Sequence, residues 1–186
     1  MTILNAIICQ MCNPTLVKMP QTSLDDIDCR IIAALHADGR LSNVDLAERV
    51  GLSPSPCLRR VKRLEREGYI AGYRAMLPRG RVGLGFTVFV GVKIEGHADD
   101  QAYAFEEGVV AMPEVVACHM VSGDDDYMLE VIVPGLEQYQ KFLVGKLMEL
   151  PTVKEVRSNI AIETLKAEAP LPLDHLNRRD DGRTPA

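Results

Sequence analysis

The chain has 186 residues and a formal net charge of −5, which excludes a protein that is basic throughout. The charge is uneven, because residues 40–81 carry a net charge of +6 and residues 82–186 a net charge of −9. Only the basic segment suits a polyanion such as nucleic acid. No apolar run reaches the roughly 18 residues of a bilayer span, so we expect no membrane association.

The chain contains five cysteines: Cys9, Cys12, Cys29, Cys57 and Cys118. An odd number without regular spacing favours a reducing compartment, and we expect a cytoplasmic protein. Cys9 and Cys12 form a single pair, whereas a structural zinc site needs four ligands, so no metal site is expected. Residues 1–22 lack the features of a secretory signal. We interpret them as a flexible extension, with Met19 as an alternative start to Met1.

Residues 23–70 are predicted to form three short helices separated by tight turns. The first helix is predicted to start after Ser23 and to run to Ala37. Ser42, followed three residues later by an acidic residue, is a capping signature for the second helix, which Gly51 ends. Short helices joined in this way indicate a helix-turn-helix.

The third helix follows immediately and is strongly basic. Ser53 or Ser55 is its N-cap, because each precedes a proline suited to the first helical turn. At about 100° per residue, Leu58, Val61 and Leu64 lie on one apolar stripe and arginines occupy the opposite face. The helix is therefore predicted to bury the apolar stripe and to present the arginines.

Small residues at the start of this helix allow it to enter a DNA groove, and arginine forms paired hydrogen bonds with guanine or phosphate. We predict that Arg59 and Arg63 read or clamp DNA, while Cys57 falls on the core side and is buried. The alternative for such a run of charge is a solvated basic face. The full set of DNA-binding candidates is Ser53, Ser55, Pro56, Arg59, Arg60, Lys62 and Arg63.

Residues 71–85 are predicted to be a linker strand and hinge, and residues 86–168 a second domain. Hydrophobic periodicity in this domain alternates between period two and helical spacing. The predicted elements are strands over 87–94, 115–121, 127–133 and 153–165 and helices over 101–112 and 136–150. This βαββαβ order is that of a ferredoxin-like domain with two helices on one sheet face. Residues 169–186, rich in Pro, Asp and Arg, are predicted to be a disordered tail.

The segment Ser122-Gly123-Asp124-Asp125-Asp126-Tyr127 joins two of these strands. A plain hairpin loop is one interpretation, because Asp and Gly are turn formers. Three adjacent carboxylates repel one another, however, and a ligand ammonium or backbone N–H groups would relieve that repulsion. Gly123 allows close approach of a ligand carboxylate, so an amino acid would satisfy both requirements. Calcium is disfavoured, because the spaced oxygen ligands of an EF-hand are missing.

The sequence contains no convincing catalytic constellation. Cys118 and His119 are adjacent on a predicted strand, so their side chains point to opposite faces and cannot readily share a proton. His36, His97 and His175 have no metal-ligand partners at a recognisable spacing. We therefore expect neither an enzyme nor a cofactor.

Several short motifs occur in one order along the chain: Leu24-Asp25-Asp26-Ile27-Asp28, Asp38-Gly39-Arg40, Val50-Gly51-Leu52-Ser53-Pro54-Ser55-Pro56, Gly83-Leu84-Gly85, Met112-Pro113-Glu114-Val115 and Gly123-Asp124-Asp125-Asp126-Tyr127. Together they resemble the Lrp/AsnC family of feast/famine transcriptional regulators, over roughly residues 24–166. The number and order of the motifs make the resemblance specific, which a lone helix-turn-helix would not be.

The resemblance implies an α+β protein with an N-terminal winged helix-turn-helix and a ferredoxin-like βαββαβ effector domain of the RAM type. It implies a linker strand that pairs with its counterpart in a homodimer, and further assembly into an octamer; dimer, tetramer and octamer stay open. Effectors of the family, commonly amino acids, bind near the loop that corresponds to residues 123–127, at contacts between dimers. The candidate residues carried over are Ser122, Gly123, Asp124, Asp126, Tyr127 and Ser158.

These expectations describe a cytoplasmic transcriptional regulator that binds a pseudo-palindromic promoter site in double-stranded DNA. A small effector would change its assembly or DNA affinity, and DNA would change effector affinity in return. The alternative is an amino-acid-binding metabolic or interaction protein whose helical domain makes only protein contacts. DNA binding that is absent or insensitive to salt would favour this alternative.

Overall fold

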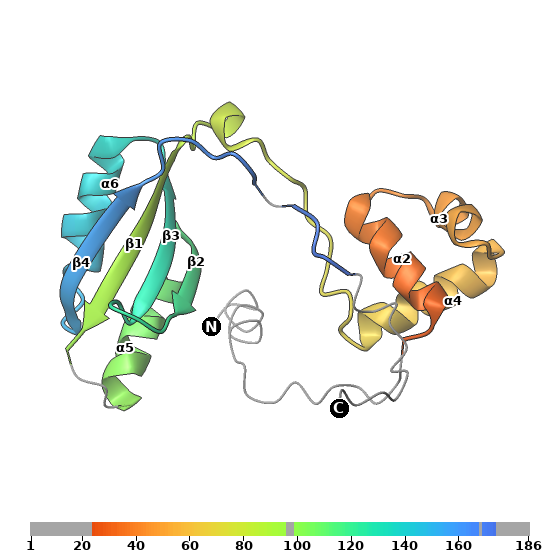
Figure 1. The fold of residues 1–186 in the computed structure, drawn as a ribbon, viewed down its shortest axis with the longest axis horizontal. Coiled ribbons are helices and arrows are strands. Elements are labelled where there is room, and N and C mark those ends of the chain that lie inside the picture. Colours follow the sequence, from red (N-terminus) through yellow and green to blue (C-terminus); the bar gives the residue numbers. More distant parts are fainter. Residues whose placement is uncertain (1–23, 96–98, 168, 174–186) are drawn as a thin grey trace, which may run out of the picture. The chain divides into compact units, whose positions relative to one another are not determined.

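The computed structural model describes residues 24–95, 99–167 and 169–173 (Figure 1). The predicted extension, the alternative start at Met19, the Cys9 and Cys12 pair and most of the predicted tail lie outside these ranges. The described residues divide into a helical unit, residues 24–75 with 166–173, and a sheet unit, Met76–Leu165. The division falls inside the predicted linker. None of the helices described is long and apolar enough to cross a membrane.

The helical unit contains the three predicted helices, α2 (Asp26–Ala37), α3 (Asn43–Val50) and α4 (Pro54–Arg66). They enclose one apolar core, in which Cys57 and Leu64 are fully buried, as predicted. Leu58, by contrast, is 42% exposed, so its predicted place in the buried stripe was wrong. The buried members of this core are Ile31, Ala34, Leu46, Ala47, Val50, Cys57, Val61 and Leu64.

Side-chain caps and one left-handed glycine set the helix ends. The predicted start after Ser23 was wrong: Asp25 is the N-cap of α2, and a capping box links it to Asp28. Ser42 caps α3 as predicted, and Gly51 ends that helix at φ 74°, a conformation that glycine adopts without a Cβ clash. Of the two serines proposed for α4, Ser53 is the N-cap, without a side-chain hydrogen bond.

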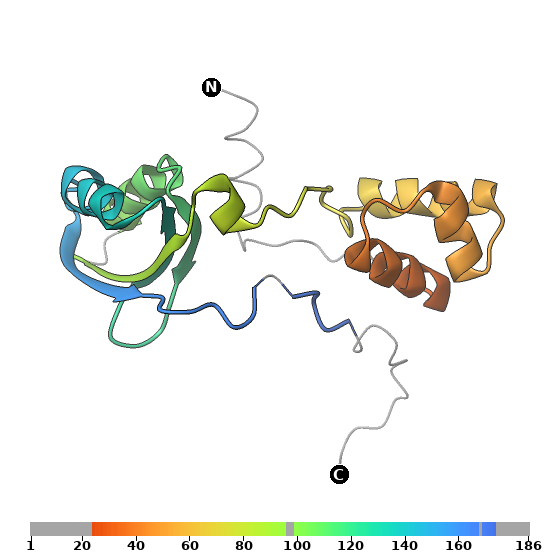
Figure 2. The same cartoon turned by 90° about the horizontal axis from the view of Figure 1, so that it is seen from above.

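The sheet unit confirms the βαββαβ order. Its four strands are antiparallel to their neighbours, in the order β2-β3-β1-β4. Both helices cover one face of the sheet (Figures 1 and 2). The elements are β1 (Phe86–Ile94), α5 (Asp99–Val110), β2 (Val115–Met120), β3 (Tyr127–Val133), α6 (Leu136–Phe142), η2 (Leu143–Leu147) and β4 (Val153–Ile160). Strand β4 ends at Ile160, earlier than the predicted end at residue 165. The helix predicted over 136–150 is α-helical only to Phe142 and continues as the π-helix η2.

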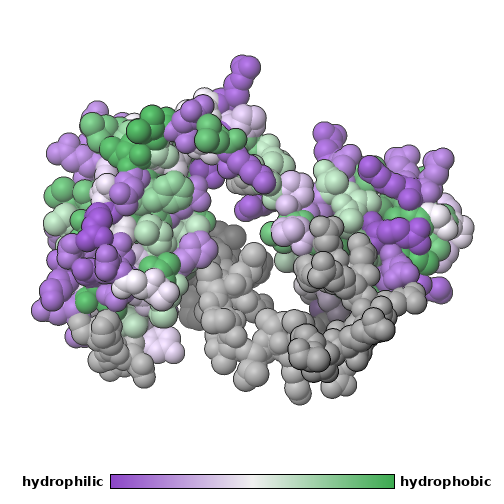
Figure 3. Space-filling model, viewed as in Figure 1, coloured by the Kyte–Doolittle hydropathy of each residue, from purple (hydrophilic) through white to green (hydrophobic). Residues whose placement is uncertain are grey.

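Alternation along the strands separates a covered face from an open one. Val88, Val90 and Val92 are fully buried beneath the helices, whereas Phe89 between them is 42% exposed. A period of two places alternate side chains on opposite faces of the sheet. Apolar side chains also reach the outer surface of the sheet unit (Figure 3), among them Leu136 and Val144.

The segment between α4 and β1 carries no strand. Residues 71–78 have no regular secondary structure, and η1 (Arg79–Val82) is a short 3-10 turn. The predicted linker strand therefore forms no ladder with the residues that the structure describes.

Candidate nucleic-acid interface and effector loop

Helix α4 presents one exposed polar stripe. Ser55, Arg59, Lys62 and Arg66 succeed one another at intervals of four, three and four residues, and all are exposed. This spacing places them along one side of an α-helix. The N-cap Ser53 is also exposed, and Pro56 is half-buried. The stripe therefore offers hydroxyl and cationic groups to a partner without any change in the fold.

Arg60 and Arg63 do not belong to this stripe. Arg60 Nη1 lies 2.6 Å from Asp25 Oδ2 and 2.9 Å from Asp28 Oδ1, and Arg63 donates to the other oxygen of Asp28. Both arginine side chains are nearly three-quarters buried, and Asp28 is 1% exposed. The structure therefore turns two of the predicted DNA-binding residues toward the start of α2.

The electrostatics at this contact favour the charged forms of Asp25 and Arg60. Partial burial raises the pKa of Asp25, but the backbone N–H of Asp28 and the guanidinium of Arg60 outweigh it and lower the pKa overall. The hydrogen bonds that Arg60 donates to the carboxylates of Asp25 and Asp28 raise its own pKa. All four arginines of α4 line an open hollow of about 400 Å³: Arg59, Arg60, Arg63 and Arg66.

Three structurally important residues were missed among the predicted candidates. Arg66 extends the exposed stripe by one turn, and its side chain is 73% exposed. The Asn43 side-chain amide donates to the backbone oxygen of Pro54 at 2.8 Å and so ties the start of α3 to the start of α4. Asp28 joins α2 to α4. Its spacing from Asp25 is a capping signature, but nothing local in the sequence points to α4.

The predicted effector loop is a tight connection between β2 and β3. Val121 N–H donates to Asp126 O at 3.0 Å and closes it. Ser122, Gly123 and Asp124 at its tip are exposed, and Gly123 has φ 137°, a backbone conformation that disfavours other residues. The tip therefore offers a hydroxyl, a carboxylate and accessible backbone to a small ligand.

The three successive aspartates do not form one cluster. Asp126 Oδ2 accepts from Ile94 N–H at 2.9 Å, and Asp126 N–H donates to Val92 O at 2.9 Å. Asp125 lies over Gly91, where an added Cβ would come within 2.2 Å of its Oδ2, and its Oδ1 is 3.5 Å from Arg157 Nη1. Two of the aspartates thus fasten the loop to the sheet, and Asp124 alone faces outward.

Tyr127 and Ser158 lie on the covered side of the sheet. Tyr127 is 3% exposed and its hydroxyl donates to Glu106 Oε1 at 3.0 Å. Burial, and then this carboxylate, raise the pKa of Tyr127 strongly. The Ser158 hydroxyl is hydrogen-bonded to the hydroxyl of Tyr139. The structure therefore brings Ser122, Gly123 and Asp124 together at the loop tip. Tyr127 and Ser158 are instead hydrogen-bonded to Glu106 and Tyr139.

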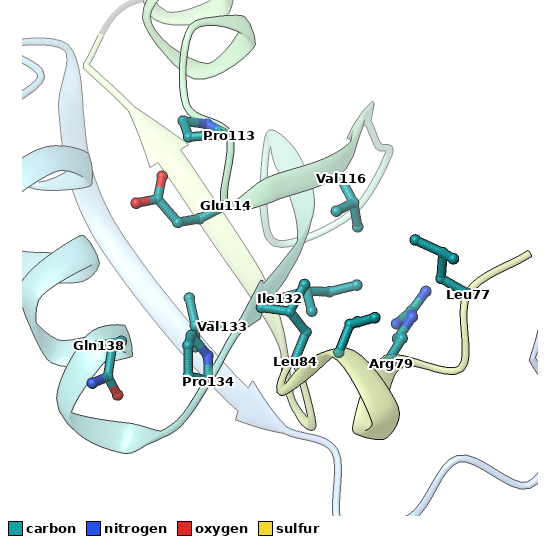
Figure 4. A pocket seen from close by; sticks show the side chains of 11 residues that line it. Leu77, Arg79, Leu84, Pro113, Glu114, Val116, Ile132, Val133, Pro134 and Gln138 are labelled. Carbon is teal, nitrogen blue, oxygen red and sulfur yellow. The ribbon is translucent and has the colours of Figure 1, made fainter. Parts of the chain in front are cut away.

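A second hollow, of about 370 Å³, lies beside η1 and includes no predicted site residue (Figure 4). Two ion pairs flank it: Arg79 with Glu130 at 2.8 Å and Lys146 with Glu114 at 2.5 Å. Its wall is otherwise mainly apolar. The lining residues are Leu77, Arg79, Val82, Leu84, Pro113, Glu114, Val116, Ile132, Val133, Pro134 and Gln138.

Cys118 packs against the core of the sheet unit and His119 is exposed, so the two side chains separate as predicted. Throughout the described ranges, no group of three or more His, Cys, Asp or Glu side chains could hold a metal ion.

Known proteins resemble both units. A family model of the Lrp/AsnC ligand binding domain matches residues 87–171, and a model of a winged helix-turn-helix DNA-binding domain matches residues 24–71. The leucine-responsive regulatory protein of Escherichia coli (strain K12) is 44% identical over 149 residues, which cover 80% of this chain and 91% of that protein.

Solved structures agree with these matches. A transcriptional regulator from Neisseria meningitidis, in complex with L-Met, shares 38% identity at a TM-score of 0.79, over 82% of this chain and 99% of that one. An AsnC family regulator from Agrobacterium tumefaciens shares 36% identity at a TM-score of 0.78, with the same coverage. The chain therefore belongs to the Lrp/AsnC family of DNA-binding transcriptional regulators.

Proposed function

We propose that this regulator contacts promoter DNA in the cytoplasm through the exposed stripe of α4. The observation that carries the proposal is the stripe itself, in which Ser55, Arg59, Lys62 and Arg66 are all exposed, whereas Arg60 and Arg63 are paired with acidic side chains. An α-helix fits the major groove, and cationic side chains neutralise phosphates on either side. The remaining candidates, Ser53 and Pro56, lie where the helix would enter the groove.

The working unit is a homodimer that places two copies of α4 on the halves of a pseudo-palindromic site. The open sheet face with Phe89 exposed, and a linker that forms no strand with the described part of its own chain, both support association with a second copy. Further assembly of dimers, up to an octamer, would bring several binding helices to one promoter.

The effector is an amino acid that binds at the tip of the loop through Ser122, Gly123 and Asp124. Support comes from their exposure and from the L-Met complex of the Neisseria meningitidis regulator. The Asp124 carboxylate suits the ligand ammonium, and backbone N–H groups near Gly123 suit its carboxylate. Asp126 holds the loop in place. Tyr127 and Ser158, the other candidates, would first have to release Glu106 and Tyr139.

The test of DNA binding is titration of the full chain against duplex DNA from its own upstream region at two salt concentrations. Arg59→Ala is expected to weaken binding by about tenfold or more and to reduce the salt slope by about one. Lys154→Ala, which removes an equal charge from the sheet unit, is the control. Absent or salt-insensitive binding by the unaltered chain would support instead an amino-acid-binding protein whose helices contact only proteins.

The test of the effector is thermal unfolding of the full chain in the presence of each amino acid. A ligand at 100 times its Kd stabilises the folded state by about 2.7 kcal/mol. Asp124→Asn is expected to abolish the shift while leaving the unliganded midpoint unchanged. A shift that survives Asp124→Asn would place the ligand elsewhere.

A further inference from the structure

Asp28 is the most deeply buried charged residue described in the helical unit, with 1% of its surface exposed. It lies on α2, not on the helix that carries the exposed stripe. A buried carboxylate is strongly unfavourable unless opposite charges and hydrogen-bond donors surround it. The contacts that satisfy Asp28 therefore have to be kept for the helical unit to hold its structure.

Those contacts come from two directions. At its own helix, Asp25 N–H donates to Asp28 Oδ2 at 3.2 Å, and Asp28 N–H donates to Asp25 Oδ1 at 2.8 Å. From α4, Arg60 Nη1 donates to Asp28 Oδ1 at 2.9 Å and Arg63 donates to Oδ2. Each oxygen of Asp28 thus receives one guanidinium group, and the capping box aims both oxygens at α4.

Arg60 and Arg63 lie three residues apart, nearly one turn, on the same side of α4. Two contacts at different heights on one helix fix its rotation about its own axis as well as its tilt. Successive residues are about 100° apart on a helix, so even a partial rotation would turn Arg59 and Lys62 away from their present direction. The direction of the exposed stripe consequently depends on Asp28 as well as on the buried side chains of α4.

We propose that Asp28 is a positioning residue for DNA recognition, which acts through Arg60 and Arg63 and does not touch DNA. This inference rests on the proposed function and divides the arginines of α4 by role. Arg59 and Arg66 contact DNA, together with Lys62, while Arg60 and Arg63 hold the helix at the angle that recognition requires.

Charge alone predicts the opposite result for the decisive variant. Asp28→Asn removes a negative charge close to a phosphate-binding surface, so an electrostatic effect would tighten DNA binding. A positioning role predicts weaker binding to the specific site, because one partner of a buried charge pair is lost. The sign of the change therefore separates the two explanations.

The experiment compares Asp28→Asn with Glu48→Gln in the full chain, using the upstream duplex and an unrelated duplex at two salt concentrations. Glu48 is exposed on α3, so its replacement makes the same charge change without touching α4. We expect Asp28→Asn to lose about tenfold or more in specific affinity with little change for the unrelated duplex. Equal or tighter specific binding by Asp28→Asn, matching Glu48→Gln, would overturn the inference.

Arg63→Gln carries the test if Asp28→Asn melts the helical unit, which circular dichroism will show. A positioning role predicts that Arg63→Gln loses specific affinity with the salt slope unchanged, and that Asp28→Asn adds no further loss where the double variant folds. A salt slope reduced by about one would make Arg63 a phosphate contact and overturn the inference. If the unaltered chain binds no DNA, the proposed function itself fails.

Discussion

Helix α4 and the loop at residues 122–127 both carry neighbouring groups of like charge. In each region some of these side chains are anchors, which are held by contacts within the protein, and the others face outward. In α4, Arg60 and Arg63 are anchors and Arg59 faces outward. In the loop, Asp125 and Asp126 are anchors and Asp124 faces outward. In both regions, neighbouring side chains of like charge therefore have two different roles: some stabilise the local structure and others are available to a partner.

The two regions anchor their charges by different means. The helix uses carboxylates that lie 32 to 35 residues away, and a single side chain, Asp28, serves two arginines. The loop uses the backbone of the adjacent strand for Asp126, and the missing Cβ of Gly91 for Asp125. One substitution can thus disturb both anchors of the helix, whereas the anchors of the loop are lost separately.

The largest expected effects test whether the two regions have independent cores. Leu64→Ala in the helical unit and Leu129→Ala in the sheet unit each remove a fully buried side chain. Each is expected to destabilise by about 2–5 kcal/mol. Calorimetry should show that each variant lowers the unfolding transition of its own unit. A common shift of all transitions would show that the units unfold together.

The next effect concerns the anchor of Asp125. Gly91→Ala places a Cβ where Asp125 lies, so the carboxylate has to move, at an expected cost of about 1–3 kcal/mol. Denaturant unfolding of the sheet unit measures this loss, and the effector-induced thermal shift should fall with it. Gly85→Ala, which meets nothing within 4 Å, is the matched control and should stay within about 0.5 kcal/mol.

A smaller effect should separate the two kinds of aspartate. Asp126→Asn weakens a charge-assisted hydrogen bond to Ile94 N–H and is expected to destabilise by about 1 kcal/mol, whereas Asp124→Asn should be neutral. Effector titration should show the reverse order, with Asp124→Asn the more damaging. Equal losses of stability in the two variants would contradict the division of the loop.

The smallest effect is a pH dependence of the helical unit. The folded pKa of Asp25 is lowered by the Asp28 N–H and by Arg60, despite the opposing effect of burial. A lowered pKa contributes stability that is complete above the unfolded value, near 4, and is lost as the pH falls through the folded value. Urea unfolding at about pH 5.5 and pH 3 should show this loss, and Asp25→Asn should reduce it.

Local signals in the sequence predict most of the fold. Ser42 and Gly51 mark the ends of α3 correctly, because a capping hydroxyl and a left-handed glycine act within one helical turn. The alternation around Val88, Val90 and Val92 likewise predicts a strand with one buried face. These features depend on near neighbours only, and a single sequence contains them.

The candidate sites are predicted less completely, because their anchors come from distant residues. An angular projection of α4 places Arg63 opposite the apolar stripe, but it cannot show from which side α2 approaches. The projection also places Leu58 in the core, although no neighbour covers it fully. In the loop, the sequence shows three aspartates, and only the folded structure shows that Asp125 meets Gly91.

The link from Asp28 to α4 has a consequence for how new operator preferences can arise. Positions 28, 60 and 63 depend on one another, so a change at any of them needs a compensating change at another. Positions 55, 59, 62 and 66 carry no such dependence on α2. The residues that read a promoter can therefore be substituted one at a time, in a laboratory or by natural selection, while positions 28, 60 and 63 keep the helix in place.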